Sequence, residues 1–252
     1  MVRTWYESLV VLDRSKRVSF MNYGYSDSDP ANTLSLSPAE STNRYAIQLY
    51  HHLAGSIDLN DKDVVEIGSG RGGGAAYVNR TFNPRSMLGI DISKNAVQFC
   101  NTHFSDPHLS FAHGDAENIP LADASVDAVI NVESSHCYGS MERFLSEVRR
   151  ILRPDGHFLF TDHRDEEQLP VLRRQLQDAG FTTAVETDIT QNVVKALELD
   201  NERKRELIQS TLPRLLWHEA EEFAAQVGTR AYESFRTEAS RYVSFTLRKS
   251  SH

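Results

Sequence analysis

The chain has 252 residues, of which 40% are hydrophobic and 25% are charged, as expected for a globular domain with a substantial core. Its net charge of −8 argues against a nucleic-acid partner, because phosphate binding requires a basic face. The 2 cysteines give no disulfide framework, and no apolar run approaches the ~20 residues of a membrane span. Because no signal peptide is recognisable either, we expect a cytoplasmic protein without a membrane span.

Residues 1–59 precede the first strand-like pattern. They contain the stretch Asn22-Tyr23-Gly24-Tyr25, a turn-rich segment through Pro30 and a helical pattern over 41–54. Segments that flank a rigid scaffold often carry function. We therefore predict that residues 1–59 form an N-terminal helical lid, which would exclude water from a site beneath it.

From residue 60 onward, apolar strand-like runs alternate with helical patterns. We expect strands near 63–67, 86–91, 109–112, 125–131, 157–162 and 182–188, and helices near 72–81, 93–103, 141–152 and 168–179. Such alternation is typical of βαβ units. It predicts an α/β fold with a Rossmann-like, doubly wound sheet of seven mostly parallel strands and helices on both faces, with residues 60–189 as a cofactor-binding core.

The last part of the chain interrupts this alternation. Helical patterns cover 191–196, 204–212 and 217–227, and the final run 241–247 alternates like a strand. We predict one domain over residues 1–252, with a helical insertion before the last strand. Residues 190–240 would form a substrate cap, and residues 241–252 the last strand and tail.

A buried strand runs into a glycine loop between Val64 and Gly74. Gly68, Gly70 and Gly73 satisfy the G-x-G-x-x-G spacing of a dinucleotide site, but Glu66 lies two places before the first glycine. A pyrophosphate would be repelled by this carboxylate, whereas an ammonium and a sulfonium would be attracted to it. The loop therefore favours S-adenosylmethionine, which carries both positive charges and no phosphate.

Two further acids lie at strand ends. Asp91 ends the second predicted strand and could accept both ribose hydroxyls, and Asp115 follows the third strand, where it could accept from an adenine amino group. The glycine spacing with Asp91 also leaves open a nicotinamide-dependent dehydrogenase, or a binding module with no catalytic activity.

These motifs resemble those of class I S-adenosylmethionine-dependent methyltransferases over residues 60–164. A closer resemblance, carried by Asn131-Val132-Glu133-x-Ser135-His136-Cys137-Tyr138 among other stretches, is to the phthiotriolone/phenolphthiotriolone dimycocerosate methyltransferases. The resemblance implies S-adenosylmethionine as cofactor and O-methylation of a hydroxyl on a hydrophobic small molecule, such as a polyketide, lipid or other secondary metabolite. A homodimer stays open as an assembly.

The resemblance also implies a set of cofactor-binding positions. Asp91 would hold the ribose, with Ile92 on the adenine, and Asn131 would lie beside the sulfonium. The full implied set is Tyr23, Tyr25, Glu66, Gly68, Ser69, Gly70, Asp91, Ile92, Asp115, Ala116, Asn131 and Val132. Tyr23 and Tyr25 would cover the methionine part as aromatic lid residues.

Catalysis is expected at the end of the fourth strand. An alcohol acceptor must lose its proton during transfer, and His136 suits the role of base because histidine titrates near neutrality. His163 is the second candidate base. Glu133 resembles an acid of isoprenoid C-methyltransferases that could stabilise a carbocation, so C-methylation of an alkene stays open. No clustered ligand pattern predicts a metal site.

Overall fold

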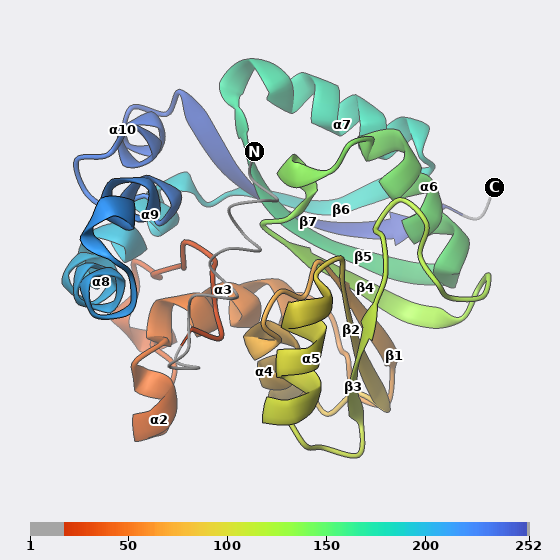
Figure 1. Cartoon of the computed structure of the whole chain (residues 1–252). Helices are drawn as coiled ribbons and strands as arrows, with labels where there is room; N and C mark the ends of the chain where they lie inside the picture. The colour runs from red at the N-terminus through yellow and green to blue at the C-terminus, as the bar shows by residue number, and fades with distance from the viewer. Residues whose placement is uncertain (1–17, 251–252) are drawn as a thin grey trace.

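The computed structural model describes residues 18–250; residues 1–17 of the predicted lid and 251–252 of the tail lie outside the described part. Within residues 18–250, seven strands form one sheet in the order β3-β2-β1-β4-β5-β7-β6 (Figure 1). The strands are β1 (Asp63–Ile67), β2 (Ser86–Asp91), β3 (Leu109–His113), β4 (Val126–Val132), β5 (Leu152–Asp165), β6 (Phe181–Asp188) and β7 (Ser240–Lys249). Only β7 runs antiparallel to its neighbours in this sheet, so the predicted mostly parallel, Rossmann-like architecture is confirmed.

Helices cover both faces of the sheet, as predicted. Figure 1 shows α6 and α7 on one face and α3, α4 and α5 on the other. The helices and short 3-10 turns are η1 (Pro30–Asn32), α2 (Pro38–Ser41), α3 (Arg44–Ala54), α4 (Gly73–Phe82), α5 (Lys94–His103), η2 (Ser135–Cys137), α6 (Met141–Ile151), η3 (Glu166–Gln168), α7 (Leu169–Asp178), α8 (Thr190–Thr211), η4 (Arg214–Leu216), α9 (Trp217–Phe223) and α10 (Arg230–Arg236).

Helix α6 shows how sequence pattern sets these elements. Ser140 caps its N-terminus, where the Ser140 side chain accepts from the backbone N–H of Arg143. Phe144 and Val148, four residues apart, are fully buried against the sheet. The helix ends at Ile151 because the next residue already pairs in β5.

The predicted helical insertion lies between β6 and β7, but its helices differ from the prediction. The patterns over 191–196 and 204–212 belong to one continuous helix, α8. The polar residues between them find partners without breaking the helix. Asp200 pairs with Arg203 one turn on, and Asn201 accepts from Gln226 and Val227 of the neighbouring segment.

The insertion stands beyond the carboxyl ends of the parallel strands, beside α2 and α3 (Figure 1). Along the part of the chain that the structure describes, no helix combines the length and apolar character needed to cross a bilayer.

Candidate active site

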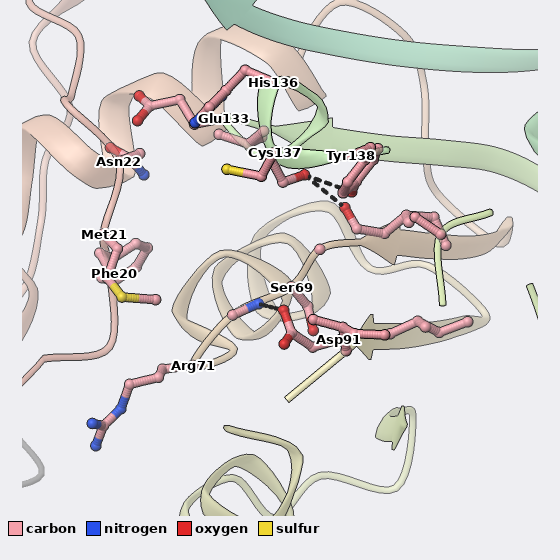
Figure 2. Close-up of a pocket in the computed structure, with 18 of the residues that line it drawn as sticks. Phe20, Met21, Asn22, Ser69, Arg71, Asp91, Glu133, His136, Cys137 and Tyr138 are labelled. Atoms are coloured by element: carbon pink, nitrogen blue, oxygen red, sulfur yellow. Dashed lines mark hydrogen bonds between the residues drawn. The ribbon is translucent and has the colours of Figure 1, made fainter. Parts of the chain in front are cut away.

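A cavity of about 280 Å³ opens where the carboxyl ends of β1, β2 and β4 meet. In Figure 2, Glu133 and His136 lie at one end of this cavity, and Ser69 and Asp91 lie at the other. The predicted site residues that line it are Tyr23, Gly68, Ser69, Gly70, Asp91, Ile92, Asp115, Ala116, Val132, Glu133 and His136. This edge of an open α/β sheet is where ligands of such folds bind.

The glycine loop turns sharply beneath the cavity. The backbone N–H of Gly68 donates to the Ile90 carbonyl at 2.8 Å, and Gly68 itself has a φ of 76°. A Cβ at this position would lie 2.4 Å from the Ser134 hydroxyl. Glycine is therefore required both for the backbone conformation and for the close approach of the β4 loop.

Asp91 fixes the other side of this loop. One carboxylate oxygen accepts from the backbone N–H of Gly70 at 2.8 Å (Figure 2). The other accepts from the backbone N–H of Ser93 at 2.8 Å. Asp91 also lines the cavity, where a carboxylate is suited to accept from hydroxyl groups of a ligand. Nearby, the buried Ser69 Oγ has no hydrogen-bond partner among the described residues.

Glu66 is fully buried and does not line the cavity, in contrast to the direct contact predicted for it. Tyr50 donates a 2.6 Å hydrogen bond to the Glu66 carboxylate and lines the cavity in its place. Burial raises the pKa of Glu66 to about 7. A Cβ on Gly74 would lie 1.9 Å from the Tyr50 ring, so the glycine run also makes room for this tyrosine.

Two other predicted cofactor residues lie outside the cavity lining. Asn131 is fully buried, and its amide nitrogen donates to the Ile67 carbonyl and to Ser134 Oγ, each at 2.8 Å. It therefore joins β4 to β1 beneath the site. Tyr25 stacks on the His52 ring with centroids 4.5 Å apart, because its backbone is paired to Tyr45 on α3.

Glu133 occupies a strained position at the end of β4, with a φ of 46°. Its Oε1 accepts from the backbone N–H of Tyr23 at 2.7 Å and from the Tyr242 hydroxyl. Burial raises the pKa of Glu133 to about 7, although both hydrogen bonds oppose this. The carboxylate thus holds the 18–23 segment against the strand ends.

Asp162, at the end of β5, orders the loop that carries His136. The buried carboxylate accepts from Ser135 Oγ at 2.6 Å and from His136 Nδ1 at 2.8 Å. Arg164 lies 3.3 Å from the same carboxylate. Burial raises the pKa of Asp162, but the neighbouring His136 and Arg164 outweigh this and hold it far below its usual value.

His136 keeps 28% of its side chain exposed at the cavity. Burial lowers its pKa, but the charge of Asp162 and the hydrogen bond to it more than compensate and raise the pKa well above the usual 6.5. The sequence alone predicts a base that titrates near neutrality, so the pairing with Asp162 corrects that expectation.

His163 does not line the cavity. Its ring packs against Tyr23, Phe235 and His136, with centroids 5.7, 5.5 and 4.4 Å away. Burial lowers the pKa of His163 to about 4, which keeps the imidazole neutral. The second candidate base therefore lies behind the Tyr23 ring.

Among the described residues, His136, Asp162 and His163 also form a group whose ligand atoms lie within 4.8 Å of one another. The sequence showed no such cluster because the three residues lie on two separate strand ends. The guanidinium of Arg164 beside Asp162 opposes a further cation there. The absence of a metal from the reaction stays a prediction.

Comparison with known proteins identifies the class. A protein family described as a methyltransferase domain matches residues 65–160. A fatty-acid O-methyltransferase of Mycolicibacterium smegmatis is 39% identical over 89% of this chain and 81% of its own length. A phthiotriol/phenolphthiotriol dimycocerosates methyltransferase of Mycobacterium tuberculosis is 35% identical over 90% of this chain and 84% of its own. The fold and the site define a methyltransferase that uses S-adenosylmethionine.

Within that class, the chain belongs to the family of these fatty-acid and phthiotriol/phenolphthiotriol dimycocerosates methyltransferases. Among solved structures, a cyclopropane synthase from Mycobacterium tuberculosis superposes with a TM-score of 0.72 at 15% identity, covering 95% of each chain. A geranyl diphosphate C-methyltransferase from Streptomyces coelicolor gives 0.65 at 19% identity, covering 90% of this chain and 87% of its own. Both show the shared fold. The methyltransferase prediction is confirmed, and the dehydrogenase alternative is wrong.

The cavity fits S-adenosylmethionine. The Asp91 carboxylate and the unpartnered Ser69 Oγ suit a polar ligand such as the ribose. The apolar Ile92 and the strand-end Asp115 suit an adenine ring and its amino group. Sequence reasoning missed Tyr50 and Tyr138 as lining residues, although Tyr138 lies in the stretch that carries the family resemblance.

Proposed function

We propose that this methyltransferase O-methylates a hydrophobic small molecule, with the acceptor oxygen placed between His136 and Val132. The observation that carries the proposal is the Asp162–His136 pair, which opens on the same cavity as the glycine loop and Asp91. The two relatives support it, since one is a fatty-acid O-methyltransferase and the other acts on phthiotriol-type dimycocerosates.

S-adenosylmethionine supplies the methyl group, and the chain's own residues handle the proton and the geometry. Asp162 accepts from His136 Nδ1, which fixes the ring and leaves Nε2 for the acceptor. With a hydroxyl acceptor, neutral His136 would take the proton as the new C–O bond forms and the bond between the methyl carbon and the sulfonium sulfur breaks, with S-adenosylhomocysteine as the leaving group. Tyr23 and Phe223 line the cavity and exclude water from it.

C-methylation is the second candidate, and Glu133 favours it. Within residues 18–250, both hydrogen bonds to this carboxylate are accepted by Oε1, and Glu133 lines the cavity beside Val132. The second oxygen could therefore stabilise a positive charge that develops on an alkene acceptor.

Product analysis distinguishes the two reactions. The purified protein is incubated with methyl-labelled S-adenosylmethionine and a panel of long-chain acids, alcohols, phenols and prenyl compounds. We expect the labelled carbon to have the NMR shift of an O-methyl group. A label found on carbon would replace our proposal with C-methylation, and no product from any acceptor would contradict both.

A further inference from the structure

A second cavity of about 120 Å³ lies behind the 18–23 segment, between α3, α8 and α9. It shares part of its wall with the first cavity, namely Phe20, Met21, Asn22, Tyr23, Arg71 and Phe223. A molecule that reaches past these side chains would occupy both cavities at once. No predicted cofactor role involves the second cavity beyond Tyr23.

One face of α8 forms the longest wall of this cavity. Its lining residues recur with the spacing of a single helical stripe, which continues into the C-cap Leu212: Asp200, Arg203, Lys204, Leu207, Ile208 and Thr211. The polarity of the side chains in this stripe changes along the helix. The stripe begins with charged residues and ends with aliphatic ones, so the cavity has a polar end and an apolar end.

The polar end is the one nearer to the methyl-transfer cavity. Lys204 Nζ donates to the Tyr23 carbonyl at 3.2 Å, and its charge acts on Glu133, which lines the first cavity. Asp200 and Arg203 form an ion pair with each other, and the carboxylates of Asp200 and Glu133 both act on the charge of Lys204, so this end of the cavity is lined by charged groups. A polar head group would therefore be stabilised here, beside Tyr23.

The apolar end is built from residues that pack outside the main core. Ile208, Leu212 and Ala220, with Trp217 and Ala224 against them, form a hydrophobic cluster separate from those on the two sheet faces. Four of these five also line the second cavity. Protein interiors are close-packed, and an apolar void leaves its walls without dispersion partners. A hydrocarbon chain would supply those partners.

We infer that the second cavity receives the hydrocarbon tail of the acceptor while its oxygen is methylated in the first cavity, so that the acceptor is a single-chain amphiphile. At about 120 Å³ the second cavity is less than half the size of the first, which favours one narrow chain over a ring system. The inference rests on the proposed O-methylation and adds the class of acceptor to it.

The test uses the whole chain and a series of unbranched saturated acids and primary alcohols, from short to long. Ala220→Leu narrows the apolar end, and Ile208→Ala widens it. Gln209→Leu adds the same side chain on the exposed face of α8 and is the matched control. Binding of S-adenosylhomocysteine is measured for every variant to show that the fold and the cofactor site are intact.

We expect Ala220→Leu to lower kcat/KM for the longest chains about tenfold or more and to change that of the shortest by less than about twofold. Ile208→Ala should shift the preferred length the opposite way, and Gln209→Leu should match the unaltered protein. If Ala220→Leu does not fold, the shift in Ile208→Ala decides the question.

One set of results would contradict the tail site, and a different result would contradict the proposed O-methylation. An unchanged length profile in both cavity variants, or a preference of the unaltered protein for compact ring acceptors, would remove the tail site and leave O-methylation standing. A protein that binds S-adenosylhomocysteine but methylates no oxygen of any acceptor would instead remove the proposed function.

Discussion

The charge on His136 decides how the proposed reaction depends on pH. Asp162 stabilises the imidazolium and so raises the pKa of His136, whereas only the neutral ring can take a proton from a hydroxyl. The fraction of neutral His136 grows as pH rises. For an alcohol acceptor, we therefore expect turnover to increase with pH through an apparent pKa well above 6.5.

Variants of His136 and Asp162 test the expected rise of turnover with pH, which is measured as the pH profile of kcat. His136→Ala should lower turnover on an alcohol roughly 10²–10⁴-fold and abolish the pH-dependent limb, with cofactor affinity unchanged. Asp162→Asn should move the limb to lower pH, because the imidazolium loses its carboxylate partner. His163→Phe keeps a ring in place and should be nearly normal. A severe loss there, with His136→Ala active, would move the base to His163.

Asp91 is predicted to hold the ribose of the cofactor. Asp91→Asn preserves the shape of the side chain but removes its charge, which should weaken S-adenosylmethionine binding by about 1–3 kcal/mol. Calorimetric titration measures this loss, with the exposed Asp58→Asn as control. Equal affinities in the two variants would mean that the ribose lies elsewhere in the cavity.

Glu66 links burial to stability in the ligand-free protein. Its pKa is raised from 4.5 to about 7 by burial, so its favourable contribution is complete below pH 4.5 and is lost as pH rises through about 7. Glu66→Gln carries no such charge and should flatten the pH dependence of the unfolding free energy over that window. Urea denaturation at several pH values measures it. An identical slope in both proteins would contradict the raised pKa.

At the scale of elements, we expect the 18–23 segment to become more ordered when a ligand binds in the first cavity. Tyr23 is held by its backbone N–H to Glu133 and by its carbonyl to Lys204, two groups from β4 and α8. These few contacts couple the segment to whatever fills the cavity that Tyr23 lines.

We expect bound S-adenosylhomocysteine to slow hydrogen exchange in residues 20–30 more than in α6, which is remote from the cavity. Glu133→Gln should weaken this protection, because the neutral amide is a poorer acceptor for the Tyr23 N–H. Equal exchange with and without the ligand would show that the segment is a fixed covering, and the lid prediction would be wrong.

The elements themselves were largely predictable, because their signals are local. Strands such as β1 and β2 were placed to the residue by apolar runs between glycines and acids. Helix α8 was predicted in two pieces, since the charged stretch around Asp200 suggests a break when its partners on the neighbouring segment are unknown.

Sequence patterns predicted the site residues whose roles depend on their position at a strand end or in the adjoining turn. Asp91 and Gly68 follow from strand ends and turn geometry, both local in sequence. The contact of Glu66 with Tyr50, and of His136 with Asp162, joins residues 16 and 26 positions apart. Such pairs change a group's pKa and its access to the ligand, and no local pattern reports them.

At the scale of the whole molecule, the two cavities are lined largely by different parts of the chain. The sheet and its glycine loop line much of the first cavity, while the insertion, residues 190–239, provides more than half of the residues that line the second. If the proposed tail site is correct, donor recognition depends on the sheet, and recognition of the acceptor's tail depends largely on residues 190–239 together with the 18–23 segment that lines both cavities.

The insertion also leaves and re-enters the sheet at one place. Its flanking strands β6 and β7 are hydrogen-bonded neighbours, with Asp188 beside Val243, and the Ile189 N–H donates to the Tyr242 carbonyl where α8 begins. A segment whose two ends are pinned side by side on a rigid sheet can be exchanged as a cassette, since its replacement leaves the sheet's own pairing intact. Under the proposed tail site, evolution could vary the acceptor's tail by drift in residues 190–239, and protein engineers could graft that stretch between relatives while the methyl-donor scaffold stays the same.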